Sequence, residues 1–243
     1  MGALAEQRDP RHAEVEAALD RVCDPELDEP VTELGFIEAV DIDDAGDVTV
    51  GFRLPTFWCS PNFAWLMASG IATEVGRLPW AGAVRPVLRD HMFGEQINEG
   101  VASGQSFTET FGDEAESDIE AVREKFRIKA FQRRQEAVLR GLLADGETAE
   151  TIAAMTAGEL EGRTLGNLDA ERQRLRYLDI RPGFAKDNAQ AFTDENGAPV
   201  TADGFSARLE LLRSVRLNME FTGSICRSLL SVRDEAAKPA GAT

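Results

Sequence analysis

The first hundred residues alternate between two patterns of apolar positions. Apolar side chains recur at helical spacing over residues 12–23 and 61–77, so each segment is expected to bury one face of a helix. The period-two alternation typical of a strand marks three other segments: 36–42, 48–54 and 83–88. The order helix, strand, strand, helix, strand predicts a small two-layer α-β-β-α-β domain, and so an α+β fold class.

A different pattern follows this domain. Glycines interrupt residues 96–113 and no period persists there, so we expect a connecting arm. Long amphipathic segments then predict a helical C-terminal extension over residues 114–235. Residues 236–243 are expected to be a disordered tail. The predicted organisation is therefore an α+β domain at 1–95, the arm, the helical domain and the tail.

Charge is distributed unevenly along the chain, whose net charge is −17. Residues 1–120 contain 25 Asp and Glu against 7 Arg and no Lys, whereas residues 121–243 contain 18 acidic and 19 basic side chains. An acidic half of this kind repels phosphate backbones, so we expect no nucleic-acid partner. No apolar run approaches the ~20 residues of a membrane span, and the first residues lack the apolar core of a secretory signal.

The cysteines argue against two classes of protein. There are three, an odd number, they lie far apart, and none belongs to a CxxC pair: Cys23, Cys59 and Cys226. This pattern does not fit a disulfide framework or a self-contained metal cage. It is typical of a reducing compartment, so we predict a cytoplasmic protein.

Cys59 lies in the predicted turn between the second strand and the second helix. Free backbone N–H groups at a helix N-terminus stabilise a thiolate, which would suit Cys59 to nucleophilic chemistry or metal ligation. Free cysteines are also often small buried apolar residues, and the residues alone leave both interpretations open.

Four motifs around this turn resemble a known family. They are Asp24-Pro25-Glu26, Glu33-Leu34-Gly35-Phe36-Ile37, Pro55-Thr56 and Cys59-Ser60. Over residues 12–95 the chain resembles the iron–sulfur cluster assembly family of SufT-like and PaaD-like proteins. The resemblance implies a reactive cysteine before the second helix and a role in maturing iron–sulfur or other metal proteins. The chain departs from the family in its Thr–Cys spacing, in Ser60 before Pro61, in the bulky Trp58 and in its long extension.

A second resemblance concerns the residues after the third strand. The pairs Asp90-His91, Ile97-Asn98 and Gly100-Val101 are similar to those of a subgroup found beside di-iron multicomponent monooxygenases. This resemblance implies an oxygenase as the client metalloprotein.

A ligand set is predicted around the thiol. Cys59, Glu26 and His91 would supply a thiolate, a carboxylate and an imidazole, which suit zinc or ferrous iron. His91 follows the third strand and shares an edge with Cys59 if the second and third strands are neighbours. A structural, hydrogen-bonded role for His91 is the alternative.

Other residues are expected to support this set. Asp24 either supports the site or only starts a turn, and Thr56 either caps the turn or donates to the thiolate. Trp58 either covers the thiol or packs, and Asp90 adjoins His91. Cys23 is read as structural. Cys226 is read as a core residue that shares a helix face with Met219, Gly223 and Leu230.

The residues and the resemblance favour a maturation factor that is not an enzyme. Cys59 would bind iron or an iron–sulfur cluster transiently, with no cofactor necessarily retained on isolation, and deliver it to a client. One such cysteine per chain could bridge a cluster only with a second chain or with the client's ligands, so a homodimer is predicted. The alternatives are a metal-free assembly chaperone of a di-iron monooxygenase and an enzyme with a Cys59–His91 pair. No common nucleotide-binding or hydrolase motif supports the enzyme.

Overall fold

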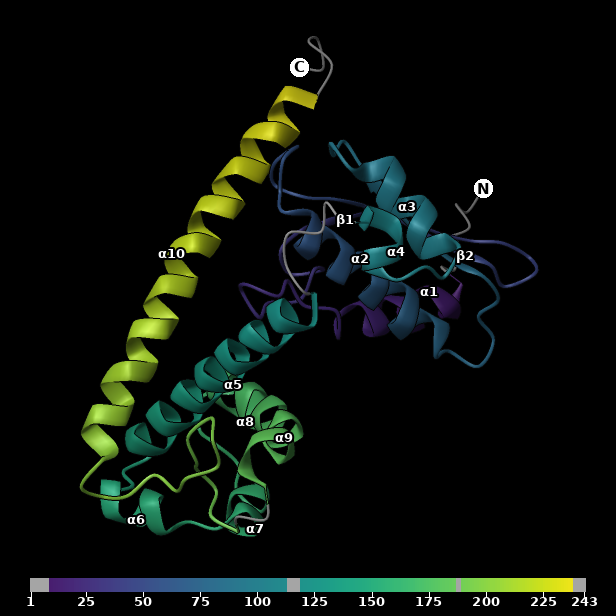
Figure 1. Cartoon of the computed structure of the whole chain (residues 1–243). Helices are drawn as coiled ribbons and strands as arrows, with labels where there is room; N and C mark the ends of the chain where they lie inside the picture. Colours follow the sequence, from purple (N-terminus) through teal and green to yellow (C-terminus); the bar gives the residue numbers. More distant parts are fainter. Residues whose placement is uncertain (1–8, 113–118, 187–188, 238–243) are drawn as a thin grey trace, which may run out of the picture. The chain divides into compact units, whose positions relative to one another are not determined.

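The computed structural model describes residues 9–112, 119–186 and 189–237 (Figure 1). The chain divides into two compact units. The first comprises Met1–Arg123 together with Thr222–Thr243, and the second comprises Glu124–Phe221.

The first unit contains the predicted succession of elements. They are α1 (Pro10–Leu19), β1 (Ile37–Ile42), β2 (Val48–Arg53), α2 (Pro61–Gly76) and β3 (Val84–Arg89). The predicted α-β-β-α-β order and the α+β class are confirmed. Pro at the first helical position starts both helices, where its fixed φ suits the first turn and no N–H partner is lost.

The sheet has the strand order β1-β2-β3. β1 and β2 form an antiparallel hairpin, and β3 pairs with β2 in parallel, from Val48 opposite Val84 to Arg53 opposite Arg89. α2 supplies the crossover that a parallel pair requires. Because parallel strands end at the same edge, the chain leaves β2 and β3 side by side. This edge positions the candidate site.

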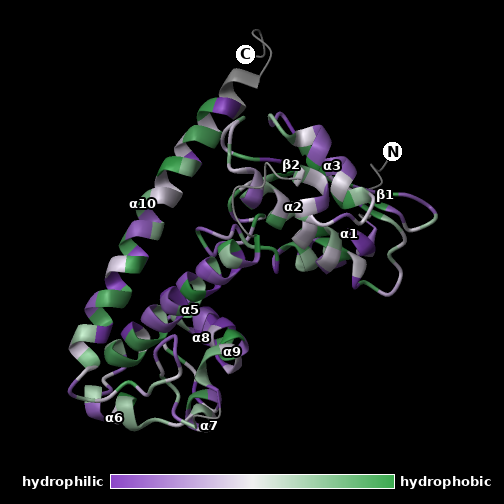
Figure 2. Cartoon of the chain, in the orientation of Figure 1, coloured by the Kyte–Doolittle hydropathy of each residue, from purple (hydrophilic) through white to green (hydrophobic). Residues whose placement is uncertain are grey.

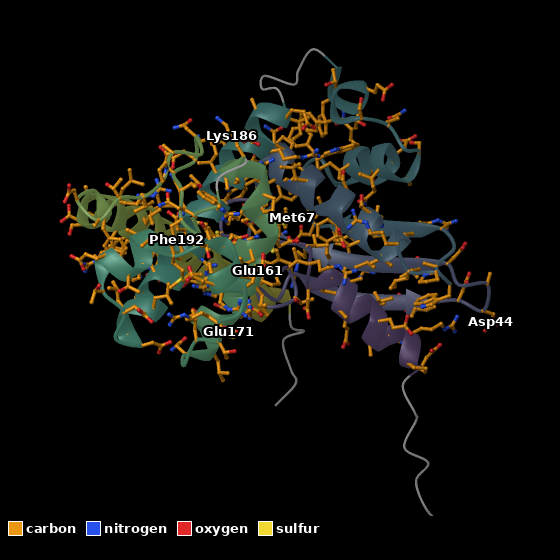
Figure 3. All side chains as sticks on the ribbon, turned by 90° about the horizontal axis from the view of Figure 1, so that it is seen from below. Asp44, Met67, Glu161, Glu171, Lys186 and Phe192 are labelled. Atoms are coloured by element: carbon orange, nitrogen blue, oxygen red, sulfur yellow. The ribbon has the colours of Figure 1, made fainter. Side chains whose placement is uncertain are left out.

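The core of the first unit lies where the helices cover the sheet. Phe52 from β2 and Met67 and Ile71 from α2 are fully buried, and Figure 3 labels Met67 among the surrounding side chains. The hairpin turn faces outward instead, with Asp44 labelled at its end (Figure 3). The sequence pattern therefore located this core correctly, since both helices bury the faces with recurring apolar residues.

The expected connecting arm is largely helical. Residues 94–111 form α3 (Gly94–Ala102) and α4 (Phe107–Phe111), which pack on the first unit's core through buried apolar side chains. Position 100, inside α3, requires a glycine, because a Cβ there would be 2.9 Å from the Trp65 ring and 2.3 Å from Thr110 Oγ1. The glycine that suggested an irregular arm is thus explained by close packing.

The second unit is helical. Most of α5 (Ile119–Ala144) belongs to it, and it continues with α6 (Ala149–Ala154), α7 (Ala157–Glu161), α8 (Leu168–Ile180) and α9 (Pro182–Ala185). Aromatic rings form its core: Phe131 stacks on Phe184, and Tyr177 stacks on Phe192, which Figure 3 labels. Tyr177 donates a hydrogen bond to the Ala191 carbonyl oxygen at 2.8 Å, so its buried hydroxyl is satisfied.

The last helix, α10 (Phe205–Ala237), belongs to both units. Apolar and polar residues alternate along it (Figure 2), and from Thr222 onward it groups with the first unit, where Leu230 is buried in the core. The C-terminal part of α10 therefore groups with the first unit, and the predicted division into domains stays a prediction. The expected tail begins within α10, and residues 238–243 lie outside the described residues. No helix of the described residues combines the length and the apolar character needed to cross a membrane.

Candidate functional site

Cys59 lies in the turn that connects β2 to α2, with its side chain partly buried. The Thr56 hydroxyl oxygen is 3.1 Å from the Cys59 sulfur, within hydrogen-bond distance for a thiol or thiolate. Phe57 and Trp58 are 46% and 72% exposed, so the two residues before the cysteine project apolar surface into solvent. The turn therefore presents a thiol beside an exposed aromatic pair, with a hydroxyl group that can stabilise negative charge on sulfur.

His91 holds this turn through its backbone. Its Nε2 is 2.9 Å from the Cys59 carbonyl oxygen, and the Phe93 N–H donates to its Nδ1 at 3.2 Å. Since Nδ1 accepts, Nε2 carries the proton, and the ring is neutral. Burial lowers the pKa of His91, and the positive charge of Arg233 lowers it further, which favours the neutral ring. Both ring nitrogens thus bind backbone groups, so the geometry makes His91 a positioning residue for the cysteine turn.

The adjacency of the two loops follows from the sheet. Strands two and three are neighbours, as the expected proximity of His91 to the cysteine turn required. A further backbone hydrogen bond, from the Met92 N–H to the Phe57 carbonyl oxygen at 2.9 Å, joins the loop after β3 to the loop after β2. Met92 is 52% exposed and extends the apolar surface begun by the aromatic pair.

Asp24 organises the Asp-Pro-Glu turn. Its Oδ1 accepts hydrogen bonds from the N–H groups of Glu26 and Leu27, both at 2.9 Å. The carboxyl is buried, and burial raises its pKa to about 6 despite these two bonds, with the charges of Glu26 and Glu29 adding to the increase. The predicted turn-forming role of Asp24 is thus seen directly, while the Glu26 side chain remains partly exposed.

Asp90 connects the site to the last helix. It follows β3 with a φ of 51°, in the left-handed region, and its carboxylate forms an ion pair with Arg233 of α10. Arg233 also donates to the Leu54 carbonyl oxygen at 2.5 Å. One guanidinium therefore fixes α10 to both loops at the edge of the sheet.

Cys226 is the residue that the sequence analysis did not connect with the site. It lies on α10, is partly buried and packs against the same core as Cys59. Burial raises the pKa of Cys226 to about 11, and the negative charges of Asp24, Cys59 and Glu26 raise it further. The neighbouring residues place this part of α10 beside the Asp-Pro-Glu turn, since a Cβ at Gly223 would lie 3.5 Å from the Leu27 side chain and Arg227 forms an ion pair with Glu29 at 2.9 Å.

The structure does not gather the predicted ligands around one point. Within the described ranges, no three His, Cys, Asp or Glu side chains form a group that could hold a metal ion. The set of Cys59, Glu26 and His91 therefore stays a prediction, in which the thiol and the carboxylate remain accessible and the imidazole is already engaged.

Part of the first unit is similar to a known family. Residues 12–85 match the family model described as iron-sulfur cluster assembly protein. The predicted resemblance to an iron–sulfur cluster assembly family is thereby confirmed for this segment, which contains the Asp-Pro-Glu turn, the hairpin and Cys59. The second resemblance, to the oxygenase-associated subgroup, stays a prediction.

Curated relatives point in the same direction. The iron-sulfur cluster carrier protein of Mycobacterium leprae is 35% identical over 82 residues, which are 34% of this chain and 21% of that protein. The iron-sulfur cluster carrier protein of Mycobacterium tuberculosis is 28% identical over 160 residues, 66% of this chain and 38% of that protein. The chain thus spans between about a fifth and two fifths of the length of these carriers. No solved structure gives a significant match.

Proposed function

We propose that this protein is a non-catalytic assembly factor in which Cys59 binds iron or an iron–sulfur cluster transiently and passes it to a client metalloprotein. The observation that carries the proposal is the accessible Cys59 thiol beside the Thr56 hydroxyl, on the turn of the segment that matches the assembly family. The curated carriers support a role in handling clusters, and the client and the mechanism are our inference.

The chemistry of this turn suits a donor that must also release its cargo. A cysteine thiolate is the common protein ligand of iron–sulfur clusters. A Thr56 hydroxyl that donates to the sulfur would withdraw electron density from it and weaken the iron–sulfur bond. Transfer is then a ligand exchange without redox change. An incoming client thiolate forms a bond to iron, the Cys59–iron bond breaks, and Cys59 takes up a proton.

The apolar surface beside the thiol suits a protein client rather than a small molecule. Phe57, Trp58 and Met92 are all more than 40% exposed and lie on the two loops at this edge. Exposed aromatic and methionine side chains are enriched in protein interfaces. We propose a di-iron monooxygenase as the first client to test, because the pairs from Asp90 to Val101 resemble the oxygenase-associated subgroup.

A metal-free assembly chaperone is the second candidate, and the same exposed apolar side chains favour it. It differs in requiring no ligand at Cys59. A Cys59–His91 enzyme is disfavoured, because both ring nitrogens of His91 bind backbone groups and the imidazole is therefore not available as a base for the thiol.

Anaerobic reconstitution with iron and sulfide tests the proposal, read by visible absorption and by mass spectrometry under native conditions. Wild type is expected to acquire iron and sulfide, and Cys59→Ser is expected to lose that uptake. Cys23→Ser is the matched control, since Cys23 lies outside the cysteine turn and pairs with Pro30 in a backbone bridge. Full uptake by a folded Cys59→Ser protein would exclude the thiol as the ligand.

A further inference from the structure

Two loops start side by side where β2 and β3 end. Leu54 begins the cysteine turn and Asp90 begins the loop after β3, since the parallel pairing runs as far as Arg53 opposite Arg89. Leu54 is buried, so its backbone carbonyl requires a hydrogen-bond donor. Asp90 has a φ of 51°, a left-handed conformation that surrounding contacts must stabilise. Both loop starts are therefore points at which an added contact can fix the backbone.

Arg233, near the end of α10, contacts both loop starts with one guanidinium. Its Nη1 donates to the Leu54 carbonyl oxygen at 2.5 Å, and its Nε donates to the Asp90 carboxylate at 3.0 Å. Its Nη2 donates to the Asp90 carbonyl oxygen and pairs with the carboxylate. The Arg233 side chain is 16% exposed, so water screens these contacts less than those of a surface ion pair. Because a guanidinium is planar and rigid, it fixes the two loop starts relative to each other.

The same two loops are joined again beside the thiol. The Met92 N–H donates to the Phe57 carbonyl oxygen, and His91 Nε2 donates to the Cys59 carbonyl oxygen, both at 2.9 Å. These bonds connect the backbone of the cysteine turn to the loop after β3. A displacement of either loop start is therefore transmitted to the backbone that carries the thiol.

We propose that Arg233 is a positioning residue for the cysteine turn, so that the end of α10 controls the order and accessibility of the Cys59 thiol. Arg233 lies outside residues 12–85, which match the assembly family, so a C-terminal element fixes a turn that the family segment supplies. With Arg233 bound, the turn keeps the thiol beside the Thr56 hydroxyl. The inference rests on the proposed function only for what the thiol then binds, because the contacts themselves require no cargo.

Arg227 provides a matched control on the same segment of α10. It forms an ion pair with Glu29, near the Asp-Pro-Glu turn, at 2.9 Å. Removal of either guanidinium deletes one ion pair between α10 and the rest of the first unit, and Arg233 adds the contacts to the two loop starts. A general effect on the packing of α10 should therefore appear in both variants, whereas an effect on the cysteine turn should appear with Arg233.

Hydrogen–deuterium exchange of the full-length, reduced protein without cargo tests the proposal. Arg233→Met keeps the apolar stem and removes the guanidinium. We expect amides of residues 56–60 and 91–93 to exchange at least about tenfold faster, because a hydrogen bond to a charged group suppresses local opening by at least that factor. Exchange within β2 should stay unchanged, which a general loss of stability would not allow. Arg227→Met should exchange like wild type in both loops.

Alkylation by iodoacetamide, read by peptide mass spectrometry, follows the thiol itself. Cys59 should react faster in Arg233→Met than in wild type, and Cys23 should react at an unchanged rate. Arg233→Lys should restore part of the protection, because it keeps the positive charge but loses the rigid fork of donors.

A double-mutant cycle tests whether Arg233 acts through Asp90. Asp90→Asn removes the charge and keeps a side chain that tolerates a left-handed backbone. Asp90→Asn alone should accelerate exchange in both loops, by a smaller factor than Arg233→Met. Arg233→Met should then add less in the Asp90→Asn background than in wild type, because the two substitutions remove a shared interaction.

The possible outcomes separate this inference from the proposed function. Wild-type exchange in both loops of a folded Arg233→Met protein overturns the positioning role, and so does equal acceleration in Arg227→Met. If Arg233→Met does not fold, wild-type exchange in Asp90→Asn overturns it instead. All these measurements use protein without cargo, whereas the proposed function is tested by uptake of iron and sulfide in wild type and Cys59→Ser. Either proposal can therefore fail while the other stands.

Discussion

The buried carboxyl of Asp24 is expected to make stability depend on pH in an unusual direction. Its pKa rises from an ordinary value of about 3.9 to about 6 in the folded protein. Because the folded state holds the proton more tightly, stability is greatest below the unfolded pKa and falls as the pH rises through the folded pKa. The whole effect is about 3 kcal/mol, since one pKa unit corresponds to about 1.4 kcal/mol.

Asp24→Asn isolates this effect. An amide oxygen can keep the two hydrogen bonds from the N–H groups of Glu26 and Leu27, while the ionisable group is lost. The unfolded carboxyl is already largely ionised at pH 4.5, so about 2 of the 3 kcal/mol fall between pH 4.5 and 7.5. The free energy of unfolding of Asp24→Asn relative to wild type should therefore rise by about 2 kcal/mol over that interval.

Urea denaturation followed by circular dichroism at several pH values measures this difference. Asp44→Asn, in the exposed hairpin turn, is the matched control for the removal of one carboxylate from the acidic first unit. The measured quantity is the difference between each variant and wild type, so other titrating groups cancel to first order. A difference for Asp24→Asn that stays constant from pH 4.5 to 7.5 would refute the reasoning.

Three further predictions follow from individual side chains. The pKa of His91 should lie below 6.5, so the protein should lose stability as the pH falls through that pKa, and the neutral ring should carry its proton on Nε2. NMR titration checks this, with a His12→Asn variant to assign the signals. A neutral ring with its proton on Nδ1 would contradict the prediction. Tyr177 is the single tyrosine, and burial raises its pKa to about 12, so its ultraviolet absorbance should change near pH 12 in the folded protein; a midpoint near 10 without unfolding would be inconsistent with its burial. Gly100→Ala should destabilise the protein by about 1–3 kcal/mol, because the added methyl group overpacks the core, and thermal unfolding measures this. Gly158→Ala in α7 is the control, since open space surrounds that position, and it should be neutral or stabilising. Equal effects of the two substitutions would contradict the close packing at Gly100.

The sequence predicts the first unit well because its periodic segments are long and its motifs lie at the element boundaries. The hairpin, both helices and the existence of the third strand follow from local patterns. The parallel pairing of β2 with β3, which creates their shared edge, was only a condition of the sequence analysis and is given by the structure. The helices α3 and α4 were not predicted. From the neighbouring residues alone, Gly100 predicts an interruption of the helix. Its presence inside α3 is explained by the close approach of Trp65, which is distant in the sequence.

The contacts of the candidate site could not be predicted from the sequence. The expected edge does hold Cys59 and His91, yet periodicity cannot show that the imidazole binds two backbone groups and not the thiol. Cys226 was correctly placed on a packed helix face. The apolar pattern of that helix face does not specify which surface of the protein the face packs on. The packing surface depends on residues distant in the sequence, such as Glu29 and Asp90, which form ion pairs with α10.

The transfer of a cluster from this protein to an acceptor tests the central claim most directly. Wild type is loaded anaerobically and mixed with an apo iron–sulfur protein, and the acceptor's visible circular dichroism is followed in time, with free iron and sulfide as the control. We predict transfer from wild type and Cys23→Ser that outpaces the free ions, and no such transfer from Cys59→Ser. Equal transfer from wild type and a folded Cys59→Ser protein would contradict the account.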